Sequence, residues 1–179
     1  MTGRIRPHRQ NPMNLYLLRH GTAVEAGTPG CATDRERPLT PEGKRKLARV
    51  AGAMEAMELS FDLLLSSPLV RARQTAEIVA RSLRAEKRLA FTDELMPGGS
   101  PRALLEAIRR HDPEPRDVLL VGHEPYLSGL IGLLVAGNAG MSVTLKKGGL
   151  GKVSAESLRC GRCAALEWLL TPKQMARMG

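Results

Sequence analysis

Aromatic side chains are scarce in this sequence, because Phe, Tyr and Trp make up 3% of its 179 residues. A core dominated by stacked rings is thereby excluded, and the interior has to be built from Leu, Val, Ala, Ile and Met. The hydrophobic fraction of 42% is nevertheless that of a globular protein, which excludes a disordered composition. The length suits one domain with a substantial core and is too short for two ordinary ones.

Cysteine is also rare, with three residues in the chain. An odd, low count does not suggest a disulfide scaffold, and the Cys160–Cys163 pair lacks the second pair that a zinc tetrad needs. No apolar run approaches the roughly 20 residues that span a bilayer, and the basic N-terminus lacks the apolar segment of a secretory signal. We therefore expect a cytoplasmic protein with no membrane partner.

Acidic residues are in the minority, since 27 Lys and Arg face 18 Asp and Glu for a formal net charge of +9. Such an excess suits nucleic acid, an acidic surface or a phosphorylated substrate, although most of it is expected to be ordinary surface charge. The patterns typical of nucleic-acid binding are missing, namely interleaved basic and aromatic residues, zinc-finger spacing and a helix-turn-helix. We therefore expect no nucleic-acid partner.

Short apolar runs predict the strands. They cover residues 13–18, 61–67, 88–92, 117–122, 148–158 and 163–170. A short turn joins the last two, so these are expected to pair antiparallel. The others alternate with predicted helices, and this alternation predicts an α/β fold with a largely parallel sheet.

Apolar periodicity and start signals predict the helices. They cover residues 39–58, 67–85, 100–111 and 124–137, with a short helix or fraying end over 171–179. Thr40, Ser67 and Ser100 each precede a proline, which suits an N-cap followed by the first helical position. Residues 1–12 are expected to form a flexible N-terminal tail, and residues 13–179 a single domain.

Three predicted strands deliver charged side chains to their carboxyl ends. The first ends in Arg19 and His20, the second leads into a helix whose first turn carries Arg71, and the fourth is followed by His123. Ligands of open α/β sheets bind in the crevice beyond the carboxyl ends of the strands. Guanidinium groups bind phosphate oxygens in pairs of hydrogen bonds, and a helix N-terminus adds free N–H groups. The sequence therefore predicts a phosphoryl-binding crevice.

The two histidines suit different roles at phosphorus. His20 lies at the strand end itself, and we expect it to be a nucleophile that forms a phosphohistidine. Gly21 is expected to leave clearance for the approaching group. His123 is expected to donate a hydrogen bond to a phosphoryl oxygen and to stabilise developing charge. Each residue alone has an ordinary structural explanation, and only their combination carries this prediction.

Four motifs give the sequence a resemblance to the histidine phosphatase superfamily, also called phosphoglycerate mutase-like. They are LLRHGTA (17–23), RPLTPEGKRKL (37–47), LLSSPLVRARQTA (64–76) and VGHEP (121–125), in the family's order. The resemblance implies a three-layer α/β/α sandwich around a mixed, mostly parallel sheet, with no metal or cofactor. It also implies that His20 becomes phosphorylated. Arg19, Arg71 and His123 would then bind the phosphoryl group.

The short spacing between these motifs resembles the small phosphohistidine phosphatases of the SixA type, because larger members carry insertions that cap the pocket. An open pocket would admit a phosphorylated side chain, so the resemblance points to a phosphorylated protein of the histidine-containing phosphotransfer type. Two alternatives stay open. One is a phosphatase of small phosphorylated metabolites such as sugar phosphates, and the other is a phosphate-recognition module without turnover.

Many members of the superfamily also place an acid near the third strand, where it protonates the leaving group. Glu94 is our candidate, with Asp93 beside it, although the surrounding FTDELMPGG differs from the mutase motif. A solvated loop carboxylate is an equally good interpretation. A phosphoimidazole leaves readily once its ring is protonated, so it requires less from a positioned acid than an alkyl phosphate does.

Overall fold

The computed structural model describes residues 12–178, and its centre is a six-stranded sheet in the order β3-β2-β4-β1-β5-β6. The strands are Met13–Arg19 (β1), Leu63–Ser66 (β2), Leu89–Phe91 (β3), Asp117–Gly122 (β4), Leu150–Ala155 (β5) and Ala164–Leu170 (β6). The four strands from β3 to β1 are parallel, whereas β5 is antiparallel to both of its neighbours. The predicted mixed, mostly parallel sheet is confirmed. Of the expected tail, residues 1–11 lie outside the described residues.

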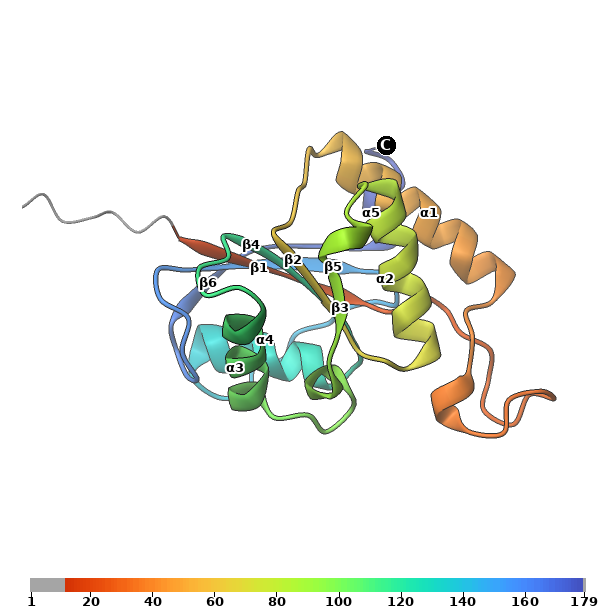
Figure 1. The fold of residues 1–179 in the computed structure, drawn as a ribbon, viewed down its shortest axis with the longest axis horizontal. Coiled ribbons are helices and arrows are strands. Elements are labelled where there is room, and N and C mark those ends of the chain that lie inside the picture. The colour runs from red at the N-terminus through yellow and green to blue at the C-terminus, as the bar shows by residue number, and fades with distance from the viewer. Residues whose placement is uncertain (1–11, 179) are drawn as a thin grey trace, which may run out of the picture.

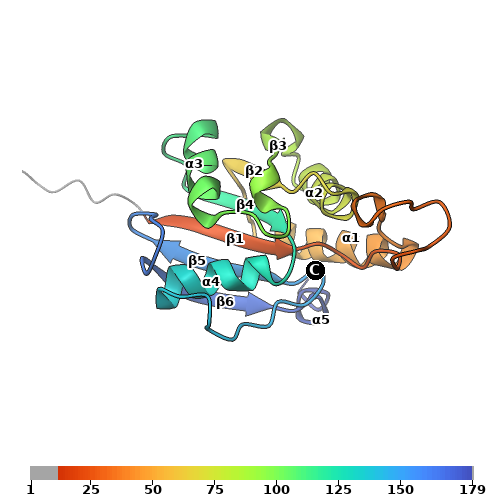
Figure 2. The ribbon, with the colours of Figure 1, turned by 90° about the horizontal axis from the view of Figure 1, so that it is seen from below.

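Helices cover both faces of this sheet, which confirms the three-layer α/β/α sandwich. They are Pro41–Ala56 (α1), Val70–Ser82 (α2), Pro101–His111 (α3), Tyr126–Ala136 (α4) and Pro172–Met175 (α5). Figure 1 shows α1, α2 and α5 on one side of the strands and α3 and α4 on the other. In the view of Figure 2, α4 lies in front of the sheet and α1 behind it. None of the helices within residues 12–178 is long and apolar enough to cross a bilayer.

The central strand β1 divides the interior into two cores because its side chains alternate between the faces. Leu15 and Leu17 pack with α3 and α4 in one core, whereas Tyr16 and Leu18 pack with α1, α2 and α5 in the other. Both cores are mainly aliphatic, as the composition predicts. A rigid, doubly covered strand therefore carries Arg19 and His20 at its end.

Two of the three predicted N-caps are confirmed. Thr40 accepts the Gly43 N–H at 2.9 Å, and Ser100 accepts the Ala103 N–H at 3.4 Å. The prediction for Ser67 is wrong, because α2 begins at Val70. The Ser67 hydroxyl lies 2.9 Å from a ring nitrogen of His123. The segment after β2 therefore stays beside the sheet, and the helix begins later than the Ser-Pro signal predicts.

Candidate active site

The register between β1 and β4 brings the two histidines together. Arg19 pairs with Gly122, so His20 and His123 are the first residues beyond the ends of two adjacent parallel strands. Their ring centroids lie 5.0 Å apart, and the rings are tilted by 54°. His20 is 8% exposed and His123 2%, so both imidazoles are largely removed from water. The predicted meeting of these two residues beyond the strand ends is confirmed.

One ring nitrogen of His20 forms a hydrogen bond with the backbone of the next residue. Nδ1 lies 2.7 Å from the carbonyl oxygen of Gly21, which only accepts hydrogen bonds, so Nδ1 carries the hydrogen. The other nitrogen, Nε2, then keeps its lone pair. Burial, together with the positive charges of Arg71, Arg19 and Lys147, lowers the pKa of His20 to about 4, although the hydrogen bond to Gly21 acts in the opposite direction. The imidazole is therefore neutral and nucleophilic at neutral pH.

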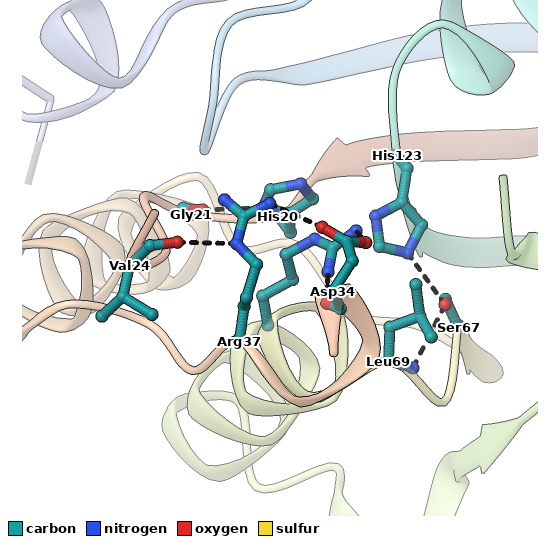
Figure 3. A network of polar contacts seen from close by, with 9 residues as sticks. His20, Gly21, Val24, Asp34, Arg37, Ser67, Leu69 and His123 are labelled. Atoms are coloured by element: carbon teal, nitrogen blue, oxygen red, sulfur yellow. Dashed lines mark hydrogen bonds and ion pairs between the residues drawn. The ribbon is translucent and has the colours of Figure 1, made fainter. Parts of the chain in front are cut away.

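The ring of His123 is fixed by a serine. Its Nε2 lies 2.9 Å from the Ser67 hydroxyl, which also accepts the N–H of Leu69 at 3.3 Å. Nδ1 is buried and has no hydrogen-bond partner among residues 12–178. In Figure 3 this second nitrogen is on the side of the ring that faces His20. Burial, together with the neighbouring His20 and Arg71, lowers the pKa of His123 to about 3.

Ser67 is a site residue that the sequence reasoning missed. It follows β2 directly, just as His20 follows β1 and His123 follows β4, and its N–H donates to the Val121 carbonyl at 3.0 Å. It is fully buried. The signal was present, because the same rule that selected the two histidines also selects the residue after β2.

The two arginines have different hydrogen-bond partners. Arg19 donates from Nη1 to the Leu145 carbonyl at 2.9 Å, and its buried Nε has no partner within the described part of the chain. Arg71 is 5% exposed and lies in the first turn of α2, as predicted. Its terminal nitrogens bond to Asp34, which the sequence reasoning did not single out.

Side chains of α2 form hydrogen bonds with the segment between β1 and α1. The buried Thr75 hydroxyl accepts the Gly21 N–H at 3.1 Å and donates to the Arg71 carbonyl at 2.7 Å. The Gln74 side chain accepts the Leu39 N–H at 2.8 Å. The RARQTA segment therefore contributes more than Arg71, because its next polar residues hold the segments that follow β1 and precede α1.

The small size of Gly21 is required by packing. A Cβ at this position would lie 2.5 Å from Leu47 Cδ1 and 3.2 Å from Leu39 Cδ2, both of which belong to the core beside α1. This packing accounts for the missing side chain, and the clearance that Gly21 would give a phosphoryl group stays a prediction. The missing side chain makes room for helix α1 to approach the strand end.

Glu94 lies on the short 3-10 helix Asp93–Leu95 that follows β3. Its N–H donates to the Thr92 hydroxyl at 3.4 Å, and its charge helps to raise the pKa of Tyr126, after the larger effect of burial. Among residues 12–178, no hydrogen bond or ion pair joins the Glu94 carboxylate to either histidine or either arginine. The structure brings the other four predicted residues together without it, and its role as an acid stays a prediction.

Known proteins are similar to this chain in sequence. The profile of the histidine phosphatase superfamily (branch 1) matches residues 15–96. An uncharacterized protein of Picosynechococcus sp. is 37% identical over 139 residues, which cover 77% of this chain and 82% of that protein. Phosphohistidine phosphatase SixA of Escherichia coli is 28% identical over 159 residues, which cover 83% of this chain and 95% of SixA.

A solved structure extends the likeness to the whole fold. The protein histidine phosphatase SixA complexed with tungstate has a TM-score of 0.76 at 26% identity, over 90% of this chain and 98% of that one. The chain therefore belongs to the histidine phosphatase superfamily, as a SixA-like phosphatase.

Proposed function

We propose that this protein removes phosphate from phosphohistidine on another protein, without a metal, through a phosphorylated His20. The observation that carries the proposal is the state of His20. The ring is buried and neutral, and its Nδ1–H is held 2.7 Å from the Gly21 carbonyl, which leaves Nε2 free to attack phosphorus. A nucleophile that needs no deprotonation is available over the whole neutral pH range.

In the first step, the Nε2 lone pair of His20 forms a bond to phosphorus. The bond between phosphorus and the substrate nitrogen breaks, and the electron pair leaves with the substrate imidazole. Arg19 and Arg71 bind the equatorial oxygens, where their fixed charges stabilise the transferring group. His123 donates from Nδ1, the nitrogen without a hydrogen-bond partner in the described part of the chain, while Ser67 donates to Nε2.

In the second step, water attacks the phosphorus of phospho-His20. The bond from phosphorus to Nε2 breaks, its electron pair returns to Nε2, and the spare proton of water passes to the phosphate or to solvent. Phospho-His20 with a hydrogen on Nδ1 is a cation and therefore a good leaving group. The Gly21 carbonyl favours this form, because it accepts a hydrogen bond from the Nδ1–H.

The carboxylates near the site support phosphohistidine as the substrate. Asp34 alone among the described acidic residues bonds to one of the four predicted site residues, and Arg37 and Arg71 hold its pKa below the ordinary value. It is ionised at neutral pH and is a poor proton donor. A substrate imidazole that carries its own proton does not need a positioned acid, whereas the alkoxide of an ester does. The similarity to SixA supports the same substrate class.

The chemistry is tested by following phosphate from a phosphohistidine-containing protein onto this chain. We expect acid-labile phosphate on the wild-type enzyme during turnover, and loss of turnover by more than about 10³-fold in His20→Ala. His111→Ala is the matched control, because His111 is exposed at the end of α3 and should leave turnover unchanged. Full activity of His20→Ala, or acid-stable phosphate on the enzyme, would contradict the proposed intermediate.

The substrate class is tested separately by comparing kcat/KM for the phosphohistidine protein with values for a panel of sugar phosphates. We expect a clear preference for the phosphohistidine protein. A preference for an ester would keep the chemistry of His20 and reassign the substrate, and it would make Glu94 the first candidate for a proton donor. Phosphate binding without hydrolysis of any substrate would favour a recognition module.

A further inference from the structure

Asp34 bonds to the guanidinium group of Arg71, the arginine that we expect to bind the phosphoryl group. It lies on the 3-10 helix Asp34–Glu36, in the segment between β1 and α1. Its carbonyl oxygen accepts a hydrogen bond from Arg71 Nη1 at 2.7 Å, and its Oδ2 accepts one from Arg71 Nη2 at 2.9 Å. One residue thus bonds to both terminal nitrogens of Arg71. Carboxylates and phosphates compete for this edge of a guanidinium group.

The Asp34 carboxylate also lies near His20 and His123. Figure 3 shows it between Arg37 and His123, with His20 close by. Its negative charge acts on His123, where it raises the pKa against the larger lowering effect of burial. A phosphoryl group that contacts Arg71 and His123 would therefore meet this carboxylate, and two anions in one place repel each other.

We propose that Asp34 is an internal competitor for the phosphate site, a carboxylate that holds Arg71 until a phosphoryl group displaces it. The inference rests on the proposed role of Arg71 in binding the phosphoryl group. It adds a residue that sets the affinity of the site for its substrate and its product.

The neighbouring contacts make this exchange inexpensive. The Asp34 side chain is 56% exposed, whereas the Arg71 side chain is 6% exposed. Asp34 is the partner that moves in the exchange, and water can solvate it when it does. Asp34 also has a second partner, because its Oδ1 accepts a hydrogen bond from Arg37 Nη1 at 2.7 Å. After the exchange, Arg71 is paired with the phosphoryl group and Asp34 with Arg37, and no buried charge is left unpaired.

A hydrogen bond to the backbone holds Arg37 in place as the second partner of Asp34. Its Nε donates to the Val24 carbonyl at 2.7 Å, which fixes the guanidinium to the same loop that carries Asp34. The backbone contact from Asp34 to Arg71 can persist during the exchange, because Nη1 carries a second hydrogen. Only the Oδ2 contact has to break. The carboxylate can return to Arg71 when the product phosphate leaves.

The test is the dissociation constant of inorganic phosphate for the wild type, Asp34→Ala and Asp34→Asn, measured by calorimetry at neutral pH. Removing the competitor should tighten phosphate binding by about fivefold, the effect of a partly exposed ion pair. Asp34→Asn guards against local unfolding, because it keeps the size and one acceptor oxygen, and it should also bind phosphate more tightly. Glu25→Gln is the control for charge, because Glu25 is exposed on the same loop and should change binding less than twofold.

Weaker or unchanged phosphate binding in both Asp34 variants would overturn the proposal, since it would show a carboxylate that only orients Arg71. Arg71→Ala separates this failure from failure of the site. Loss of phosphate binding in Arg71→Ala, with no gain in the Asp34 variants, overturns the competitor and leaves the site intact. Unchanged binding in Arg71→Ala removes the phosphate site at Arg71 and the competitor with it.

Discussion

At the scale of single residues, Gly21 links the reacting histidine to the packing of α1. Its carbonyl oxygen is the acceptor for His20 Nδ1, whereas its Cα faces Leu47 so closely that a Cβ would lie 2.5 Å from Leu47 Cδ1. We expect Gly21→Ala to lower the free energy of unfolding by about 1–3 kcal/mol through overpacking. Activity should fall as well, because relief of the clash shifts the acceptor of Nδ1. Urea unfolding and turnover with the phosphohistidine protein measure the two effects.

A double-mutant cycle with Leu47→Ala decides the cause. If the clash is with Leu47, Gly21→Ala should destabilise the Leu47→Ala background by less than it destabilises the wild type. If Gly21 instead provided clearance for the phosphoryl group, Gly21→Ala would lower activity with no change in stability. Equal destabilisation in both backgrounds, or none in either, would contradict the packing explanation.

At the scale of elements, α2 holds the strand end in place through side chains on its first two turns. Thr75 is buried, and its hydroxyl is the acceptor for the Gly21 N–H at 3.1 Å. Thr75→Val keeps the shape and leaves that N–H without its acceptor, so we expect a loss of about 1–3 kcal/mol of stability. Turnover should fall too, because the backbone beside His20 loses its anchor. Thr75→Ser is the matched control, and it should keep most of the activity that Thr75→Val loses.

The same strand and helix ends explain how far the sequence predicts this site. The rule that parallel strands end at the same edge of a sheet correctly places His20 and His123 at one edge, whereas the pairing of β1 with β4 that makes them neighbours is seen only in the structure. The prediction of Ser67 as a helix cap is wrong, because a capping residue and a residue that fixes an imidazole can both stand before a proline in the sequence.

Asp34 could not have been predicted, because nothing in the loop sequence of residues 21–38 fixes how that loop folds back over α2. Its contact with Arg71 joins residues 37 positions apart, and the sequence offers several other acidic residues for the same arginine. Gly21 shows a similar limit. The sequence indicates that a side chain is excluded there, whereas only the packing of α1 shows which atoms exclude it.

At the scale of the whole molecule, the neutral histidines make folding depend on pH. The folded pKa values of His20 and His123 are about 4 and about 3, both lowered from 6.5. Below pH 6.5 the unfolded chain binds a proton at each position and the folded chain does not, so stability falls as the pH falls. Between pH 7 and pH 5 we expect a loss of about 2 kcal/mol per histidine. Urea unfolding across this range measures it.

The histidine variants assign this loss to the site. His20→Gln and His123→Gln should each remove about half of the pH dependence between pH 7 and pH 5, and the double variant should be nearly flat. Asp34 does not contribute in this window, because its pKa is lowered from 3.8 and its stabilising effect is lost only at more acidic pH. An undiminished pH dependence in the double variant would show that folding does not lower the pKa values of these two imidazoles, and that other groups cause the loss of stability. That result would contradict the burial of two uncharged histidines on which this prediction rests.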